Sequence, residues 1–309
     1  MRSDDPVVNS WIQPLARYVE TRGAHEVVAV RPGEVRIEFP DCWREYTDRA
    51  LSLEFWEGLA TALARSQGRD WDQESRPVVS AQLPGGHRLE LLVSRRHTDE
   101  GLSASVRVNR GVRVGYGDFA APAWFQERLT WHVRNQSNIM VGGATGSGKT
   151  SLLGALLGDV PSHERVLTVE DLRELGLPHI PNRVHYVVER HEGTGITYAA
   201  ILDHLMRSRP DRILLGELSI TNVAAALMVM STGHRGLMMS VHSSSVYETV
   251  NEAFYIRYMM AGQKADRGDV AAYVKRNIDL VLQVKRGDQG RVISEMWDIA
   301  GGENPRELA

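Results

Sequence analysis

Eight consecutive positions, 143–150, carry the clearest chemistry in the chain: they read G-A-T-G-S-G-K-T and match G-x-x-x-x-G-K-[ST] at every fixed position. The apolar run before them, 138–141, is typical of a strand, and 151–157 is typical of the first turns of a helix. Glycines let successive backbone N–H groups turn toward a phosphate, and the helix N-terminus adds a positive dipole end. The alternative is a glycine-rich turn with a solvated lysine. The chain has only four lysines in 309 residues, so a chance match is rare.

This strand–loop–helix pattern predicts a nucleotide site. Lys149 is expected to reach the β- and γ-phosphates, and Thr150 to give its hydroxyl to Mg²⁺. The predicted phosphate-binding residues are Gly143, Ala144, Thr145, Gly146, Ser147, Gly148, Lys149, Thr150 and Ser151.

A pair of acids, Glu170-Asp171, ends the apolar segment 165–169. Ligands of open α/β sheets bind beyond the carboxyl ends of the strands, so Glu170 is a candidate for orienting or deprotonating the attacking water. The alternative is a helix N-cap, and for Asp171 both interpretations stay open.

Glu217 follows a second apolar run, 213–215. This segment is typical of a Walker B strand, whose acid holds Mg²⁺ through its water shell. A generic version carries an aspartate before the glutamate, whereas this chain has Gly216. Thr150 and Glu217 are therefore the predicted metal-binding residues.

Two histidines flank the next apolar run, 237–241: His234 lies before it and His242 ends it. A histidine at a strand end beside a nucleotide can bind the γ-phosphate and respond to its loss. The alternative is a buried histidine with a structural role.

Composition narrows the function classes. A net charge of −3, with 42% hydrophobic and 24% charged residues, is ordinary for a globular protein and gives no general attraction to nucleic acid. One cysteine, Cys42, excludes an internal disulfide framework and a tetracysteine zinc site. No apolar window reaches the length of a membrane span and no signal peptide is recognisable. We expect a soluble protein whose membrane association, if any, is peripheral.

The length favours two domains. Periodicity predicts an α+β N-terminal domain over 1–112, a linker over 113–134 with glycines and small residues, and a P-loop domain over 135–309 with alternating strands and helices. The elements expected in the N-terminal domain are a helix starting at Ser10, hairpins over 26–38 and 78–93, a helix over 53–66 and a strand over 103–108.

Taken together, these segments resemble the secretion-superfamily traffic ATPases, most closely the type IV secretion branch. The matching motifs, in the family's order, are GGATGSGKT (Walker A), ERVLTVEDLREL (Asp box), RSRPDRILLGEL (Walker B) and STGHRGLMMSVHSSS (His box). The N-terminal half is also similar, through EVVAVRPGEVRIE and LPGGHRLELL. In this resemblance Gly216 is the family's usual residue.

The resemblance implies an ATPase that uses ATP, has a RecA-like P-loop C-terminal domain and a smaller α+β N-terminal domain, and forms a homohexamer. It implies a place on the cytoplasmic face of the bacterial inner membrane, with inner-membrane secretion-channel proteins and a coupling ATPase as partners and no specific nucleic acid. Matched residue by residue, the catalytic set is Lys149, Glu170 as the acid, Arg173, Arg207, Glu217, His234 and His242.

Two positions depart from the family pattern. Ser219 stands where many members have arginine, and Leu237 replaces a common serine, so a hydroxyl on the phosphate side is expected to be lost. Transition-state charge usually needs an arginine from another domain or subunit. Among Arg88, Arg107 and Arg134, we rank Arg107 first because it ends the last N-terminal strand.

Three other functions stay open at this point. A pilus assembly or retraction motor, or a type II secretion ATPase, shares the same motifs. A nucleic-acid translocase would show hydrolysis strongly stimulated by nucleic acid and a steep salt dependence of binding. A nucleotide-gated scaffold would bind ATP with negligible phosphate release.

Overall fold

The computed structural model describes residues 5–109, 114–171, 173–188, 196–287 and 290–308. The chain forms two compact units, residues 1–112 and 113–309. The domain boundary expected between residues 112 and 113 lies outside the described residues.

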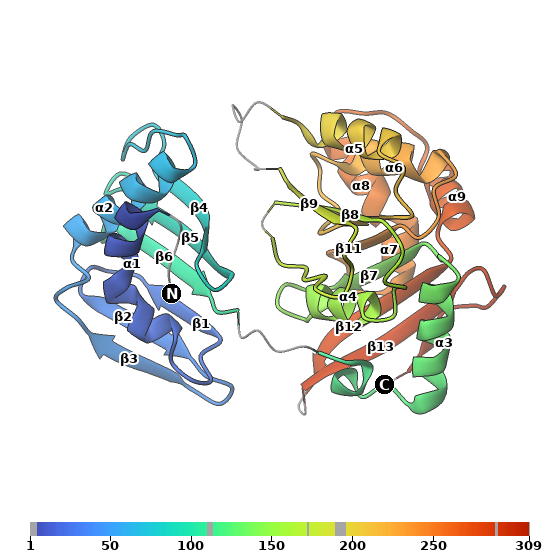
Figure 1. The fold of residues 1–309 in the computed structure, drawn as a ribbon, viewed down its shortest axis with the longest axis horizontal. Helices are drawn as coiled ribbons and strands as arrows, with labels where there is room; N and C mark the ends of the chain where they lie inside the picture. The colour runs from blue at the N-terminus through green and yellow to red at the C-terminus, as the bar shows by residue number, and fades with distance from the viewer. Residues whose placement is uncertain (1–4, 110–113, 172, 189–195, 288–289, 309) are drawn as a thin grey trace. The chain divides into compact units, whose positions relative to one another are not determined.

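The first unit is a six-stranded antiparallel sheet covered by two helices (Figure 1). Along the sheet the strand order is β3-β2-β1-β6-β5-β4. In chain order its elements are α1 (Pro6–Val19), β1 (Glu26–Ala29), β2 (Glu34–Glu38), β3 (Trp43–Thr47), α2 (Leu53–Ser66), β4 (Val78–Leu83), β5 (His87–Val93) and β6 (Leu102–Arg107).

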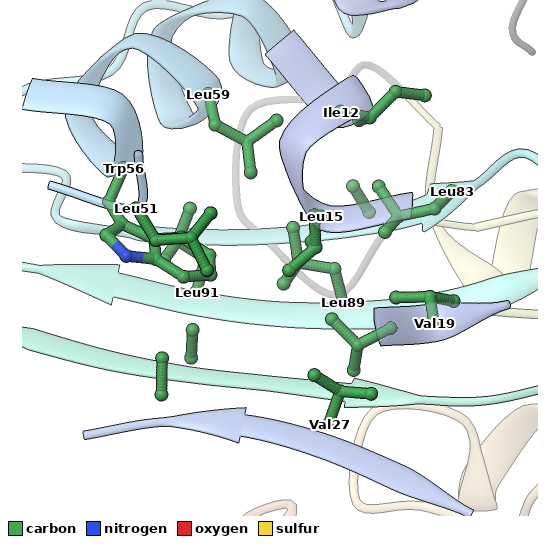
Figure 2. Packing of buried hydrophobic residues seen from close by; sticks show 14 of the residues in the cluster. Ile12, Leu15, Val19, Val27, Leu51, Trp56, Leu59, Leu83, Leu89 and Leu91 are labelled. Carbon is green, nitrogen blue, oxygen red and sulfur yellow. The ribbon is translucent and has the colours of Figure 1, made fainter. Parts of the chain in front are cut away.

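The core of this unit lies between the helices and one face of the sheet. Alternate residues of β5 are buried, and Leu89 and Leu91 point toward Leu15 of α1 and Leu59 of α2 (Figure 2). This alternation follows from the two-residue period of a strand. The predicted α+β class of this unit is confirmed.

Helix α1 begins earlier than its sequence predicts. Pro14 favoured a start at Ser10, but the helix begins at Pro6, because the Asp5 side chain accepts hydrogen bonds from the N–H groups of Val7 and Val8. Pro14 lies inside the helix and has no N–H group, so the carbonyl oxygen of Ser10 accepts no helical hydrogen bond from it. Ser10 is exposed, so water can satisfy this carbonyl.

The second unit is an eight-stranded sheet in the order β14-β13-β12-β7-β11-β10-β8-β9. The strands from β12 to β9 along this order are parallel, and β13 and β14 are antiparallel additions. Its strands are β7 (Ile139–Gly143), β8 (Val166–Glu170), β9 (Arg183–Val187), β10 (Arg212–Leu215), β11 (Met238–Val241), β12 (Leu280–Gly287), β13 (Gly290–Asp298) and β14 (Arg306–Glu307). Its helices are η1 (Tyr116–Phe119), α3 (Ala123–Arg134), α4 (Lys149–Leu157), α5 (Tyr198–Arg207), α6 (Val223–Ser231), α7 (Val246–Asn251), α8 (Ala253–Met260) and α9 (Arg267–Asn277).

Two hydrophobic cores cover the two faces of this sheet. On β7, Ile139 and Val141 belong to the core that contains α3 and α4, and Met140 belongs to the core that contains α5 to α9. The central strands are buried along their whole length, as expected for a parallel sheet with helices on both faces. The predicted α/β class is confirmed.

Part of the segment expected as a linker, 113–134, is regular structure of the second unit. It contains η1 and α3, whose Phe119, Phe125 and Leu129 are fully buried in the core beside α4. Tyr116 donates a hydrogen bond to Asp159 just after α4. Glycines and Pro122 precede α3, so the sequence around it resembles a linker more than a helix.

Candidate nucleotide-binding site

The loop between β7 and α4 has the backbone conformation that its glycines allow. Gly146 and Gly148 have φ angles of 73° and 108°, in the region that other residues rarely adopt, and α4 begins at Lys149. A Cβ atom on Gly148 would lie 2.5 Å from Cδ of Arg291 on β13. The backbone conformation therefore favours glycine at position 148, and any side chain there would displace Arg291.

Lys149 folds back onto its own loop. Its Nζ lies 3.0 Å from the carbonyl oxygens of both Gly143 and Ala144 and 3.1 Å from Nδ1 of His242, and the residue is only 7% exposed. All of these acceptors are neutral. A phosphate oxygen can therefore replace them with a net electrostatic gain.

His242 links Lys149 to Glu217. An ammonium group has donors only, so Nδ1 of His242 must accept its hydrogen bond and Nε2 carries the ring proton. That Nε2 lies 3.1 Å from Oε1 of Glu217. Burial lowers the pKa of His242, which keeps the imidazole neutral in this position.

The strand order produces this chain of contacts. β11 lies between β7 and β10, and ligand sites in parallel sheets gather at the carboxyl ends of strands. His242, which follows β11, is therefore placed between Lys149 after β7 and Glu217 after β10.

Glu170 ends β8 and is 3% exposed. Its Oε1 accepts hydrogen bonds of 3.0 Å from the backbone N–H groups of Glu174 and Leu175. Burial is the main cause that raises the pKa of Glu170 to about 7. A carboxyl group with this pKa is suited to take a proton at neutral pH.

Gly216 gives Glu170 its space. A Cβ atom at Gly216 would lie 3.0 Å from Cγ of Glu170. The glycine that departs from a generic Walker B sequence is thus explained by the neighbouring strand.

Two other predicted residues of the second unit, His234 and Arg207, lie away from this cluster. His234 precedes β11, so it lies at the amino end of this strand, whereas His242 lies at the carboxyl end. His234 shares a hydrogen bond with Thr232. Arg207, in the last turn of α5 before β10, is exposed and pairs with Asp203. Arg107 is exposed at the end of β6 in the first unit.

Arg173 lies near the end of β8, whereas Leu237 has different surroundings from those expected. Arg173 follows β8 at the carboxyl edge; it is exposed, and its charge lowers the pKa of His185. Leu237 is 1% exposed and packs in a hydrophobic core at the start of β11. The expectation that Leu237 replaces a phosphate-side hydroxyl was therefore wrong, since that end of the strand faces away from the loop.

Arg257 is a residue of the cluster that sequence reasoning missed. It lies on α8 and donates to the carbonyl oxygens of Leu218 (3.1 Å) and His242 (3.2 Å). Arg257 thereby links Leu218, the residue after Glu217, to His242 at the end of β11. The one signal in the sequence was an arginine within the otherwise apolar segment AFYIRYMM.

The residues fit a nucleotide with its metal. The Ser147 hydroxyl is buried inside the loop and has no hydrogen-bond partner among the described residues, which suits a group that meets a bound phosphate. Thr150 at the start of α4 and Glu217 offer a hydroxyl and a carboxylate oxygen, the donor types that Mg²⁺ prefers.

Comparisons with known proteins identify relatives of this chain among secretion-system proteins. Residues 72–260 match the family model described as "Type II/IV secretion system protein". The type IV secretion system protein VirB11 of Brucella suis is 30% identical, over 94% of this chain and 90% of its own length. PtlH of Bordetella pertussis, also a type IV secretion system protein, is 29% identical over 94% of both chains.

Solved structures show the same fold. The crystal structure of the VirB11 ATPase from the Brucella suis type IV secretion system, in complex with sulphate, is 29% identical with a TM-score of 0.52, covering 96% of this chain and 95% of that one. The Legionella pneumophila ATPase DotB, 20% identical, has a TM-score of 0.66 over 96% of this chain and 82% of its own. No helix within the described ranges has the length and hydropathy needed to cross a bilayer.

Proposed function

The chain belongs to the family of type II/IV secretion system proteins and is a traffic ATPase of the type IV secretion branch, and we propose that it hydrolyses ATP with Mg²⁺ to drive such a system. One observation carries the proposal. A continuous chain of contacts joins Lys149, His242 and Glu217 next to the phosphate loop. These residues and buried Glu170 all lie at the carboxyl ends of the parallel strands.

The loop binds the phosphates with its backbone N–H groups and the N-terminus of α4. Lys149 exchanges its carbonyl acceptors for phosphate oxygens, which releases His242 from the ammonium group. Thr150 and Glu217 would hold the metal, which would supply positive charge to the phosphates. Glu170 takes a proton from the attacking water, since its pKa of about 7 matches neutral pH.

His242 responds to the nucleotide through its two partners. Because its Nδ1 faces Lys149 and its Nε2 faces Glu217, movement of either side chain changes its hydrogen bonding. Arg257 passes such a change to α8, since it holds the carbonyl oxygen of His242. A local change of contacts of this kind drives larger movements in nucleotide-dependent switches.

The wider assembly is proposed from the family. We infer a homohexamer on the cytoplasmic face of the inner membrane, with secretion-channel proteins and a coupling ATPase as partners and no specific nucleic acid. We assign residues 1–112 to the N-terminal domain and residues 113–309 to the P-loop domain. Arg107 is our candidate for the arginine supplied in trans. Arg173, Arg207 and His234, which lie outside the central cluster, are candidates for contacts between subunits.

Phosphate release with Mg²⁺ and ATP tests the proposal. We expect K149A to lose nucleotide binding and turnover, and E170Q to bind nucleotide but lose turnover by about 10²-fold or more. The control is K264A, which removes an exposed lysine outside the site. Wild-type turnover by K149A would refute the assigned site, and wild-type turnover by E170Q would remove Glu170 from the catalytic role.

A further inference from the structure

The two carboxylate oxygens of Glu170 have unequal surroundings. Oε1 accepts two backbone hydrogen bonds, from Glu174 and Leu175. Oε2 is buried and has no hydrogen-bond partner among the described residues. A buried carboxylate oxygen without a donor is costly, so a group that can donate to it is expected nearby.

His185 on β9 is that group. β8 and β9 are parallel, with Thr168 opposite His185 in the register, and Thr168 and Glu170 share one face of β8 because they are two residues apart. Nδ1 of His185 lies 2.9 Å from Oγ1 of Thr168 and 4.0 Å from Oε2 of Glu170. The imidazole side chain is only 10% exposed. A side-chain rotation that brings Nδ1 about 1 Å closer to Oε2 exchanges its hydrogen bond with Thr168 for one with Glu170.

We propose that His185 is a positioning residue for Glu170: Nδ1 donates to Oε2, which keeps the carboxyl group ionised and oriented toward the attacking water. This inference rests on the catalytic role of Glu170 in the proposed function. It adds a residue of a neighbouring strand that does not itself touch the nucleotide or the water.

The charges around the pair define what His185 does. Glu174 and Asp171 raise the pKa of Glu170, in addition to burial. Burial lowers the pKa of His185, and the charges of Arg173 and Arg183 lower it further, so the ring stays neutral. A neutral ring that carries its proton on Nδ1 still favours the ionised carboxylate, because a hydrogen bond to the charged form stabilises that form.

The test is the pH profile of kcat for phosphate release at saturating Mg²⁺ and ATP. H185Q places its amide nitrogen near the Nε2 position and offers no donor at Nδ1, whereas H185N places a donor near Nδ1. We expect H185Q to move the acidic limb upward by about one pH unit, so that kcat falls about tenfold at low pH and recovers near pH 9. We expect H185N to retain the wild-type profile.

H185L is a second loss variant, and H163N, a substitution of an exposed histidine before β8, is the control. The positioning role of His185 is supported if the acidic limb of the pH profile is shifted in H185Q or H185L but is unchanged in H185N. An equal fall at every pH, or an unshifted profile in the loss variants that fold, overturns it. These results are separate from a failure of the proposed function, which would appear as full turnover by E170Q.

Discussion

Replacing Gly216 by alanine should impair turnover more than nucleotide binding. The added Cβ atom would lie 3.0 Å from Cγ, 3.4 Å from Cβ and 3.5 Å from Cα of Glu170. Gly216 has no positive φ, so alanine fits the backbone and the effect is confined to this contact.

The geometry sets the size of the effect. Carbon atoms pack at about 3.5–4.0 Å, so Cγ of Glu170 must move by roughly half an ångström. The main chain of Glu170 is held in the interior of the sheet between β10 and β9, so the carboxyl group moves instead and loses its hydrogen bonds with Glu174 and Leu175. A misplacement of about 1 Å can cost 10²-fold in rate, so we expect kcat to fall about tenfold. Overpacking should cost about 1 kcal/mol of stability.

Steady-state phosphate release and binding of a fluorescent nucleotide measure the two effects separately. G154A is the matched control, because Gly154 is an exposed residue of α4 and a Cβ atom added there would have no neighbouring atom within 4 Å. We expect G154A to keep wild-type kcat and to gain about 0.5–1 kcal/mol in stability. A G216A protein with wild-type kcat would contradict the reasoning, and so would one whose nucleotide affinity falls as much as its kcat.

Three further predictions concern neighbouring groups. R257M should lower kcat about tenfold and change nucleotide affinity less than about twofold, and R257K should recover part of the rate, as measured by the same two assays. Because folding raises the pKa of Glu170 from 4.5 to about 7, wild-type stability should decline as pH rises through that window, by up to about 3 kcal/mol. E170Q should lack this decline and be more stable than wild type at pH 8 in urea unfolding. E164L should cost about 3–5 kcal/mol, because it leaves Arg212, which is 0% exposed, buried without its carboxylate partner, and the double variant R212M/E164L should recover most of this loss in the same measurement.

Local patterns in the sequence were sufficient for the class of fold and for the phosphate loop. Alternation along β5, the apolar strands before Gly143 and Glu217, and the glycines of the loop all act within a few residues, so their effect can be read directly. The same locality explains two differences. Capping by Asp5 starts α1 at Pro6, although Pro14 favours a later start. The glycines before α3 are typical of a linker, although α3 has a buried apolar face.

The tertiary structure alone decided which strand ends adjoin. Strand order depends on pairing between distant segments, which no local period encodes. This order puts His242 between Lys149 and Glu217 and brings His185 beside Glu170. His234, in contrast, lies at the amino end of β11, away from these residues. The chemistry of each side chain was visible in the sequence, but its partners follow from contacts made across the parallel sheet.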